Sequence, residues 1–257
     1  MAVPMQVSSP PVVRRHPAWG AVRDALFPPV CVACQCGLSP PGSDLLFCQG
    51  CTEAMPLFDA IGCPRCGGPS PAADAGGCGL CRRTPLRFDA AYTAGAYDGL
   101  LRLMVLRAKR PIGEAVASAL GELIWRTRGD ELLAERIDQV AFVPMHWGRR
   151  LLRGTNAPEQ IAARLAERLA VPVTPVLRRV RYTPPQAGLA QTERIRSVRG
   201  ATALARGYFL APPSVAGRRV LVVDDVLTTG STLSDAARAL KRGAAARVVA
   251  VAAARTL

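Results

Sequence analysis

Residues 220–232 read VLVVDDVLTTGST, the stretch that is most informative about the fold class. An apolar run over residues 219–223 predicts a buried strand, and two adjacent acids, Asp224 and Asp225, stand at its carboxyl end. A small turn rich in hydroxyl groups comes next, and residues 231–242 have the pattern of a helix. Open α/β sheets bind ligands at the carboxyl ends of their strands. The stretch therefore predicts a ligand site at this edge of a sheet.

The turn after the acids is suited to hold a phosphate. Backbone N–H groups from Thr228 to Thr232, together with the positive end of the next helix, can surround a dianion. Gly230 lets the main chain approach the ligand closely. The predicted phosphate-binding residues are Val226, Leu227, Thr228, Thr229, Gly230, Ser231 and Thr232.

The two acids need a different partner, because carboxylates repel phosphate. A ribose diol, with a hydrated Mg²⁺ beside it, fits two adjacent carboxylates. A buried strand followed by an ordinary capped helix would explain Ser231 or Thr232 as a cap, but it would not explain Asp224 and Asp225. We predict that these two acids are the catalytic residues and bind the sugar.

Helical and strand patterns alternate over the rest of this region. Strands are predicted at 88–97 (or a hairpin), 139–144, 171–176, 219–223 and 246–253, and helices at 113–128, 158–170 and 231–242. Such alternation indicates βαβ units, so we predict an α/β fold with a doubly wound parallel sheet. Residues 178–208 are basic and irregular, which is typical of a surface segment.

All nine cysteines lie between Cys31 and Cys81, in a region rich in Gly and Pro. Eight of them form four Cys-x-x-Cys pairs, a spacing that lets two thiolates face one metal. We predict two zinc ribbons in tandem, one with Cys31, Cys34, Cys48 and Cys51 and one with Cys63, Cys66, Cys78 and Cys81. Four thiolates close the coordination sphere, so each zinc would be structural.

Three alternatives remain open for the cysteines. The pairs could combine crosswise, and Cys36 is either a spare thiol or a substitute for Cys34. A thioredoxin-like redox site would need a single pair at a strand–helix junction. Disulfides are not expected in a chain without an export signal, because the cytosol keeps thiols reduced.

The composition indicates a globular protein with a strongly basic surface. Hydrophobic residues make up 49% of the chain, and the formal net charge is +14, carried almost entirely by arginine. Two tetrathiolate zinc sites would lower that charge by four, to about +10. The remaining excess favours a phosphate-bearing partner, although an arginine-rich coding bias would produce the same composition.

No run of eighteen apolar residues is present, so we expect no stable membrane insertion. Residues 1–18 lack the apolar core of a secretory signal, which predicts a cytoplasmic protein. Composition changes after residue 85, beyond which no cysteine occurs. We predict a flexible tail over 1–18, a short helix (residues 19–27) plus the zinc ribbons over 19–85, and the α/β domain over 86–257.

The stretch 220–232 resembles the loop that binds phosphoribosyl pyrophosphate (PRPP) in type I phosphoribosyltransferases. That resemblance implies a type I phosphoribosyltransferase-like sheet and a PRPP site that uses Mg²⁺. Other motifs, in their order along nearly the whole chain, are similar to the ComF family of competence-associated proteins. They are Leu26-Phe27-Pro28, the cysteine module, Val143-Pro144-Met145-His146, Arg149, Arg153-Gly154-Thr155-Asn156, Gln186, Leu189, Arg194 and Ala254-Arg255-Thr256.

The resemblance to the ComF family implies a cytoplasmic factor for natural transformation, with single-stranded DNA and the competence DNA-uptake machinery as partners. The alternative is an active phosphoribosyltransferase that transfers ribose 5-phosphate from PRPP to a nucleobase or related nucleophile. Two stretches depart from the usual family pattern: Thr155 replaces an aromatic residue, and residues 197–202 read SVRGAT. These departures concern the base side of the pocket and leave the phosphate turn unaffected.

Type I domains place a pyrophosphate-contacting loop where residues 144–150 stand here. Guanidinium groups match phosphate oxygens, and Lys109 is placed like a lysine of the family. The predicted pyrophosphate-binding residues are His146, Arg149, Arg150, Arg153 and Lys109. A solvated basic turn, a helix-capping histidine and an exposed lysine are the alternatives. Arg178, Arg179 and Arg181 are expected to bind a nucleic-acid backbone, to close over PRPP or to form a solvated face.

Overall fold

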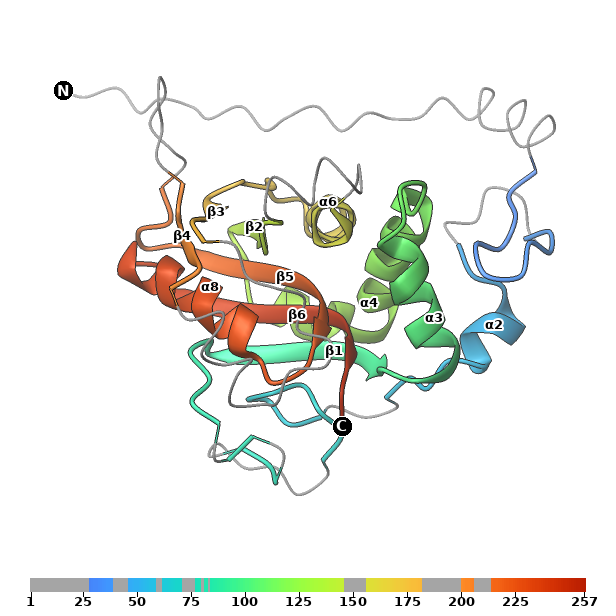
Figure 1. Ribbon diagram of the computed structural model, residues 1–257, viewed down its shortest axis with the longest axis horizontal. Coiled ribbons are helices and arrows are strands. Elements are labelled where there is room, and N and C mark those ends of the chain that lie inside the picture. Colours follow the sequence, from blue (N-terminus) through green and yellow to red (C-terminus); the bar gives the residue numbers. More distant parts are fainter. Residues whose placement is uncertain are drawn as a thin grey trace.

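The core of the protein is a four-stranded sheet with the strand order β1-β6-β5-β2, in which every pairing is parallel (Figure 1). Its strands are β1 (Ala90–Ala96), β2 (Gln139–Phe142), β5 (Arg219–Leu227) and β6 (Arg247–Arg255). The computed structural model describes residues 28–38, 46–58, 62–70, 77–79, 81–82, 84–145, 156–181, 200–205 and 214–257.

Helices cover both faces of this sheet. Leu221, Val223, Val249 and Val251 pack in a core with α3 (Gly99–Ala108), α4 (Glu114–Ala134) and α6 (Ala157–Leu169). Val220, Val222, Val248 and Ala250 alternate with them and pack in a second core with α8 (Ser231–Arg242). A parallel sheet buried on both faces needs such continuous apolar strands. The predicted doubly wound α/β fold is confirmed.

Two strand predictions need correction. Residues 171–176 form only one isolated bridge, Val140 to Val173, because Pro172 and Pro175 cannot donate hydrogen bonds to a ladder. The basic segment 178–208, predicted to be irregular, has at its ends the antiparallel strands β3 (Leu177–Arg179) and β4 (Thr202–Leu204). Three-residue strands are too short for hydrophobic periodicity to indicate them.

The cysteine-rich region packs along the free edge of β1. Thr93 Oγ1 donates to the carbonyl of Gly67 at 2.6 Å, and the Phe58 N–H donates to the carbonyl of Ala94 at 3.0 Å. The short helix α2 (Gln49–Glu53) belongs to this region. The tail 1–18 and the helix predicted over 19–27 lie outside the described residues, and the boundary at residue 85 stays a prediction.

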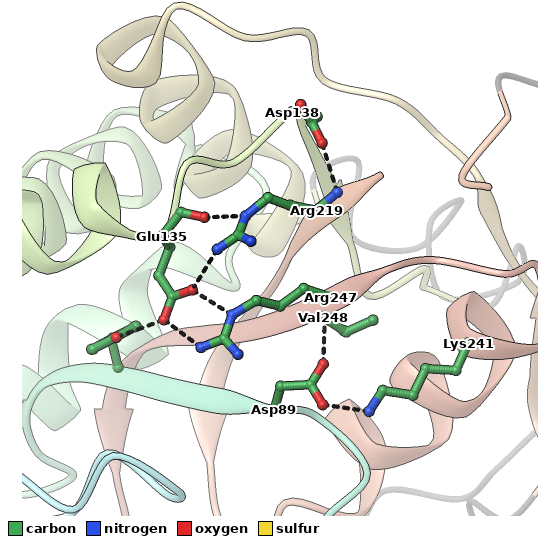
Figure 2. A network of polar contacts seen from close by, with 8 residues as sticks. Asp89, Glu135, Asp138, Arg219, Lys241, Arg247 and Val248 are labelled. Atoms are coloured by element: carbon green, nitrogen blue, oxygen red, sulfur yellow. Dashed lines mark hydrogen bonds and ion pairs between the residues drawn. The ribbon is translucent and has the colours of Figure 1, made fainter. Parts of the chain in front are cut away.

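A polar network joins the amino-terminal ends of the strands, as Figure 2 shows. The Glu135 carboxylate accepts two hydrogen bonds from Arg247, at 2.6 and 2.9 Å, and one from the Tyr92 hydroxyl at 2.9 Å. Arg219 donates from Nε to the Glu135 carbonyl at 2.6 Å. Burial raises the pKa of Glu135, but these bonds outweigh it and the pKa is lowered.

Asp89 extends the same network towards α8 (Figure 2). One carboxylate oxygen accepts from the Val248 N–H at 2.8 Å, and the other contacts Lys241 Nζ at 2.5 Å. Arg219 and Arg247 are the first residues of β5 and β6, so the network lies at the opposite end of the sheet from Asp224 and Asp225. In the part of the chain that is described, no helix is long and apolar enough to cross a membrane.

Candidate functional site

Asp224 and Asp225 lie within the last four residues of β5, at the carboxyl edge of the sheet. Asp224 is in register with Ala252 of β6, and its Oδ1 accepts a hydrogen bond from the Asp225 N–H at 2.9 Å. This bond fixes one oxygen of the first acid. The structure therefore presents two adjacent carboxylates from a strand that is paired on both sides.

Lys109 joins the two acids from another element. It is the residue that ends α3, and its Nζ lies 3.2 Å from Asp225 Oδ2. Burial lowers the pKa of Lys109, but the charge of Asp225 and the direct contact outweigh it, so the pKa is raised. The side chain is 30% exposed, so it is not fully enclosed by the protein.

The first of the two acids, Asp224, has a strongly raised pKa. Burial raises its pKa to about 7, and the neighbouring Asp225 charge acts in the same direction. Lys109 and Arg179 oppose this rise through their positive charges. Near neutral pH the carboxyl group therefore exchanges its proton readily, and a cation or a hydrogen-bond donor could displace that proton.

The turn after β5 is held by its own side chains. Gly230 has a φ of 73°, a conformation that favours glycine. The Thr229 hydroxyl accepts from the Ser231 N–H at 3.3 Å and donates to the Ser231 hydroxyl at 3.0 Å. Among the described residues, α8 begins without a side-chain cap, so its amino terminus can interact with an anion.

Glycine at position 230 is also required by packing. A Cβ placed there would lie 2.7 Å from Leu86 Cδ2, which is closer than carbon atoms pack. The sequence suggested that glycine serves the approach of the ligand, and the structure adds a hydrophobic neighbour behind the turn. Leu227, one of the predicted phosphate-binding residues, is 1% exposed, and its side chain packs in the core with α8.

The structure brings together some of the predicted site residues. Asp224, Asp225, Lys109 and the 228–232 turn gather at one edge of the sheet. His146, Arg149, Arg150 and Arg153 lie outside the described residues. Arg179 is close enough to influence Asp224, whereas Arg178 donates to the Leu204 carbonyl at 3.2 Å. In the sequence, both residues belong to the same run of charges. Their different surroundings follow from the three-residue strand β3, which the sequence did not predict.

The second group of cysteines contains the four predicted residues, Cys63, Cys66, Cys78 and Cys81, and all four are buried. Their sulfurs are 3.7 Å (Cys63 to Cys81), 3.6 Å (Cys66 to Cys78) and 4.0 Å (Cys78 to Cys81) apart. A tetrahedral zinc with bonds of about 2.3 Å places its ligands about 3.8 Å apart. The spacing therefore fits such a metal, and the crosswise combination of pairs is wrong.

A buried charge beside the second group supports the same assignment. Arg255 is 4% exposed, and its Nε and Nη1 have no hydrogen-bond partner among the described residues. Burial raises the pKa of Cys66, while the Gly68 backbone and the Arg255 charge lower it. Four thiolates around a divalent cation carry two negative charges, which would compensate this guanidinium.

The first group differs from the prediction in one residue. Its four mutually close sulfurs belong to Cys31, Cys34, Cys36 and Cys48, so Cys36 takes the place expected for Cys51. Cys51 lies on α2, and burial is the largest cause of its raised pKa. The next causes are its contacts with the thiols of Cys34, Cys48 and Cys31, so the Cys51 thiol also lies near the first group. Five thiols thus surround a site for one metal.

Cys34 and Cys36 are the exposed members of the first group, and their sulfurs are 3.3 Å apart. The Cys36 backbone N–H and neighbouring thiols lower the pKa of Cys34 to about 6. The pKa of Cys36 is raised to about 12, mainly by its contact with Cys34. Cys34 is therefore a thiolate near neutral pH, the form that binds metals.

Comparison with known proteins agrees with this architecture. The phosphoribosyl transferase domain model matches residues 159–256. The DNA utilization protein YhgH of Escherichia coli O157:H7 is 30% identical over 176 residues, which are 65% of this chain and 73% of the relative. The chain belongs to the ComF family. It is accordingly a competence-related, phosphoribosyltransferase-like protein, as its motifs predicted.

One further relative and one solved structure also match this chain. Competence protein F of Haemophilus influenzae is 26% identical, over 63% of this chain and 71% of the relative. A solved structure of glutamine PRPP amidotransferase from B. subtilis, complexed with ADP and GMP, matches with 23% identity and a TM-score of 0.32. That match covers 54% of this chain and 27% of the other.

Proposed function

We propose that this ComF-family chain binds PRPP with Mg²⁺ at the carboxyl edge of the sheet and acts as a cytoplasmic factor in DNA uptake. The observation that carries this proposal is the placement of two acids and an uncapped helix terminus on either side of one turn. A sugar phosphate has a diol at one end and a dianion at the other, and this arrangement suits both.

Each group then has a distinct role. Asp224 and Asp225 accept hydrogen bonds from the ribose hydroxyls, and the backbone of Thr228–Thr232 donates to the 5-phosphate. Lys109 balances the acids and faces the pyrophosphate, together with the predicted His146, Arg149, Arg150 and Arg153. The Mg²⁺ that accompanies PRPP would neutralise the pyrophosphate, and carboxylate oxygens are ligands that it prefers.

Zinc is the metal that we propose for both cysteine groups. All the donors are sulfur, and the spacing in the second group fits tetrahedral coordination. A closed set of four thiolates leaves no position for a substrate, so both metals would stabilise the fold. Metal analysis of the purified chain is expected to give about two zinc ions per molecule.

Calorimetric titration with Mg²⁺ and PRPP tests the main proposal. The wild-type chain should bind, and the double variant Asp224→Asn with Asp225→Asn should lose binding while its thermal unfolding stays cooperative. Asp130→Asn, at an exposed position on α4, is the matched control and should bind like the wild type. Equal affinity of the double variant would remove the assigned role of the acids.

An active phosphoribosyltransferase is the second candidate function. The raised pKa of Asp224, about 7, favours it, because a general base works best when its pKa is near the operating pH. The carboxylate would accept a proton from the nucleophile as the nucleophile forms a bond to C1 of the ribose and pyrophosphate leaves. Pyrophosphate release across a panel of nucleobases tests this step, and no release by a chain that binds PRPP would leave a binding role.

A further inference from the structure

One side chain connects the second cysteine group to the phosphate turn. Leu86 packs against the cluster formed by Cys63, Cys66, Cys78 and Cys81. Its Cδ2 also lies 2.7 Å from the point where a Cβ on Gly230 would stand. Leu86 therefore fills the space behind the turn that only glycine leaves open, and it does so from the edge of the cysteine cluster.

The segment that carries Leu86 is bonded at both ends. On the cysteine side, the Thr84 N–H donates to the Cys81 carbonyl at 2.9 Å, and Arg65 Nη2 donates to the Thr84 carbonyl at 3.1 Å. On the other side, the Arg87 N–H donates to the Ser234 hydroxyl at 3.3 Å, one turn into α8. The position of Leu86 thus depends on the cysteine cluster and on α8 together.

The cluster itself is fixed to the sheet. The Ala91 N–H donates to the Pro64 carbonyl at 3.1 Å, and the Thr93 hydroxyl donates to the Gly67 carbonyl. These bonds join β1 to the first knuckle, Cys63 to Cys66. The second knuckle, Cys78 to Cys81, precedes Leu86, and a metal shared by all four thiolates would hold it to the first.

We propose that metal bound by the second cysteine group positions the phosphate turn through Leu86, so that the affinity of the turn for a sugar phosphate depends on that metal. This inference rests on the proposed binding of PRPP at the turn. Leu86 is a positioning residue and has no contact with the ligand. Without the metal, the second knuckle loses the shared coordination that joins it to the first. Leu86 then keeps only part of its support, such as the bond from Arg65 to the Thr84 carbonyl.

Calorimetry on the zinc-loaded chain tests the role of Leu86. Leu86→Ala should weaken the binding of PRPP with Mg²⁺ about tenfold. Leu86→Met should restore most of the affinity, because it refills the space. Leu204→Ala is the matched control, because Leu204 packs in the same core against α8. Its Cδ1 lies 2.7 Å from the point where a Cβ on Gly243 would stand, at the other end of the helix.

The metal itself is tested with one cysteine from each group. Cys78→Ser should remove one zinc and weaken PRPP binding about tenfold, whereas Cys48→Ser should change the affinity less than about twofold. Amide hydrogen exchange without ligand gives an independent readout: Cys78→Ser and Leu86→Ala should speed exchange at residues 228–231, and Leu204→Ala should not.

Two outcomes would overturn the inference. If Leu86→Ala and Leu204→Ala lower the affinity for PRPP equally, the cause is a general loss of stability. If amide exchange at residues 228–231 is unchanged in Cys78→Ser, the metal and the turn are not coupled. If the wild type does not bind PRPP, the proposed function fails, but the exchange measurements still decide whether the metal positions the turn. Failure of the inference and failure of the function are therefore separable.

Discussion

At the scale of single residues, Asp224 determines how the site responds to pH. Its pKa is raised to about 7, while the proposed role in binding PRPP needs the ionised carboxylate. Binding of PRPP with Mg²⁺ should therefore tighten as the pH rises from 6 to 8, by up to about tenfold per unit below pH 7. Calorimetry in buffers of different ionisation enthalpy should also detect proton release.

The Asp224→Asn chain is the control for this pH response, since the phosphates of the ligand titrate in both proteins. A raised pKa also means that the folded state favours the protonated acid, so its contribution to stability is present below the ordinary pKa and is lost as the pH rises through 7. Asp224→Asn should consequently raise the Tm, and it should do so by more at pH 8 than at pH 5. A lower Tm at pH 8 would contradict the assigned burial of this charge.

The choice between Cys36 and Cys51 is also decided by single residues. Cys36 belongs to the group of four close sulfurs, and Cys51 lies beside it. Replacing either one alone with serine should preserve about two zinc ions per chain, because the other thiol can complete the site. The double replacement should lower the content to about one, as measured by a chromophoric chelator. Loss of zinc from Cys36→Ser alone would mean that Cys51 cannot serve.

At the scale of elements, Glu135 joins the ends of three strands (Figure 2). Its carboxylate is 8% exposed, so Glu135→Gln should lower the free energy of unfolding by about 2 kcal/mol. Glu167→Gln is the comparison: this glutamate is 64% exposed and its pair with Arg164 contributes under about 1 kcal/mol. Urea unfolding measures both. PRPP affinity should not change, because Glu135 lies at the opposite end of the sheet.

The elements differ in how well the sequence predicts them. Helix α8 begins and ends at the predicted residues, because a glycine turn precedes it and its apolar spacing is regular. Strand β5 continues past the acids to Leu227, since its pairing with β6 does not depend on side-chain polarity. The sequence could not predict the contact between Lys109 and Asp225, because this contact depends on the position of the end of α3 relative to β5.

The sequence also predicts the metal ligands only in part. The Cys-x-x-Cys spacing predicts the second group correctly, since both knuckles supply two ligands. It offers Cys36 only as a spare thiol or a substitute for Cys34, because the place of Cys36 in the first group depends on the local backbone. Gln35 has a φ of 67°, and the Cys31 N–H donates to the Cys36 carbonyl at 2.8 Å. A left-handed residue between two cysteines turns both towards one point, and spacing alone does not indicate that.

At the scale of the whole molecule, the formal net charge of +14 predicts how the chain meets single-stranded DNA. Binding to a fluorescent oligonucleotide should weaken steeply with salt, since each neutralised phosphate contributes about −0.7 to the slope of log K against log salt concentration. Replacing the exposed Arg178 and Arg181 with glutamine should reduce that slope by about 1.4 if both contact phosphates. The same change at the exposed Arg126 and Arg242 removes equal charge from other surfaces and should reduce it less. Equal effects of the two pairs would mean that charge acts without a defined binding face, and a flat salt response would end the proposal that this chain binds DNA.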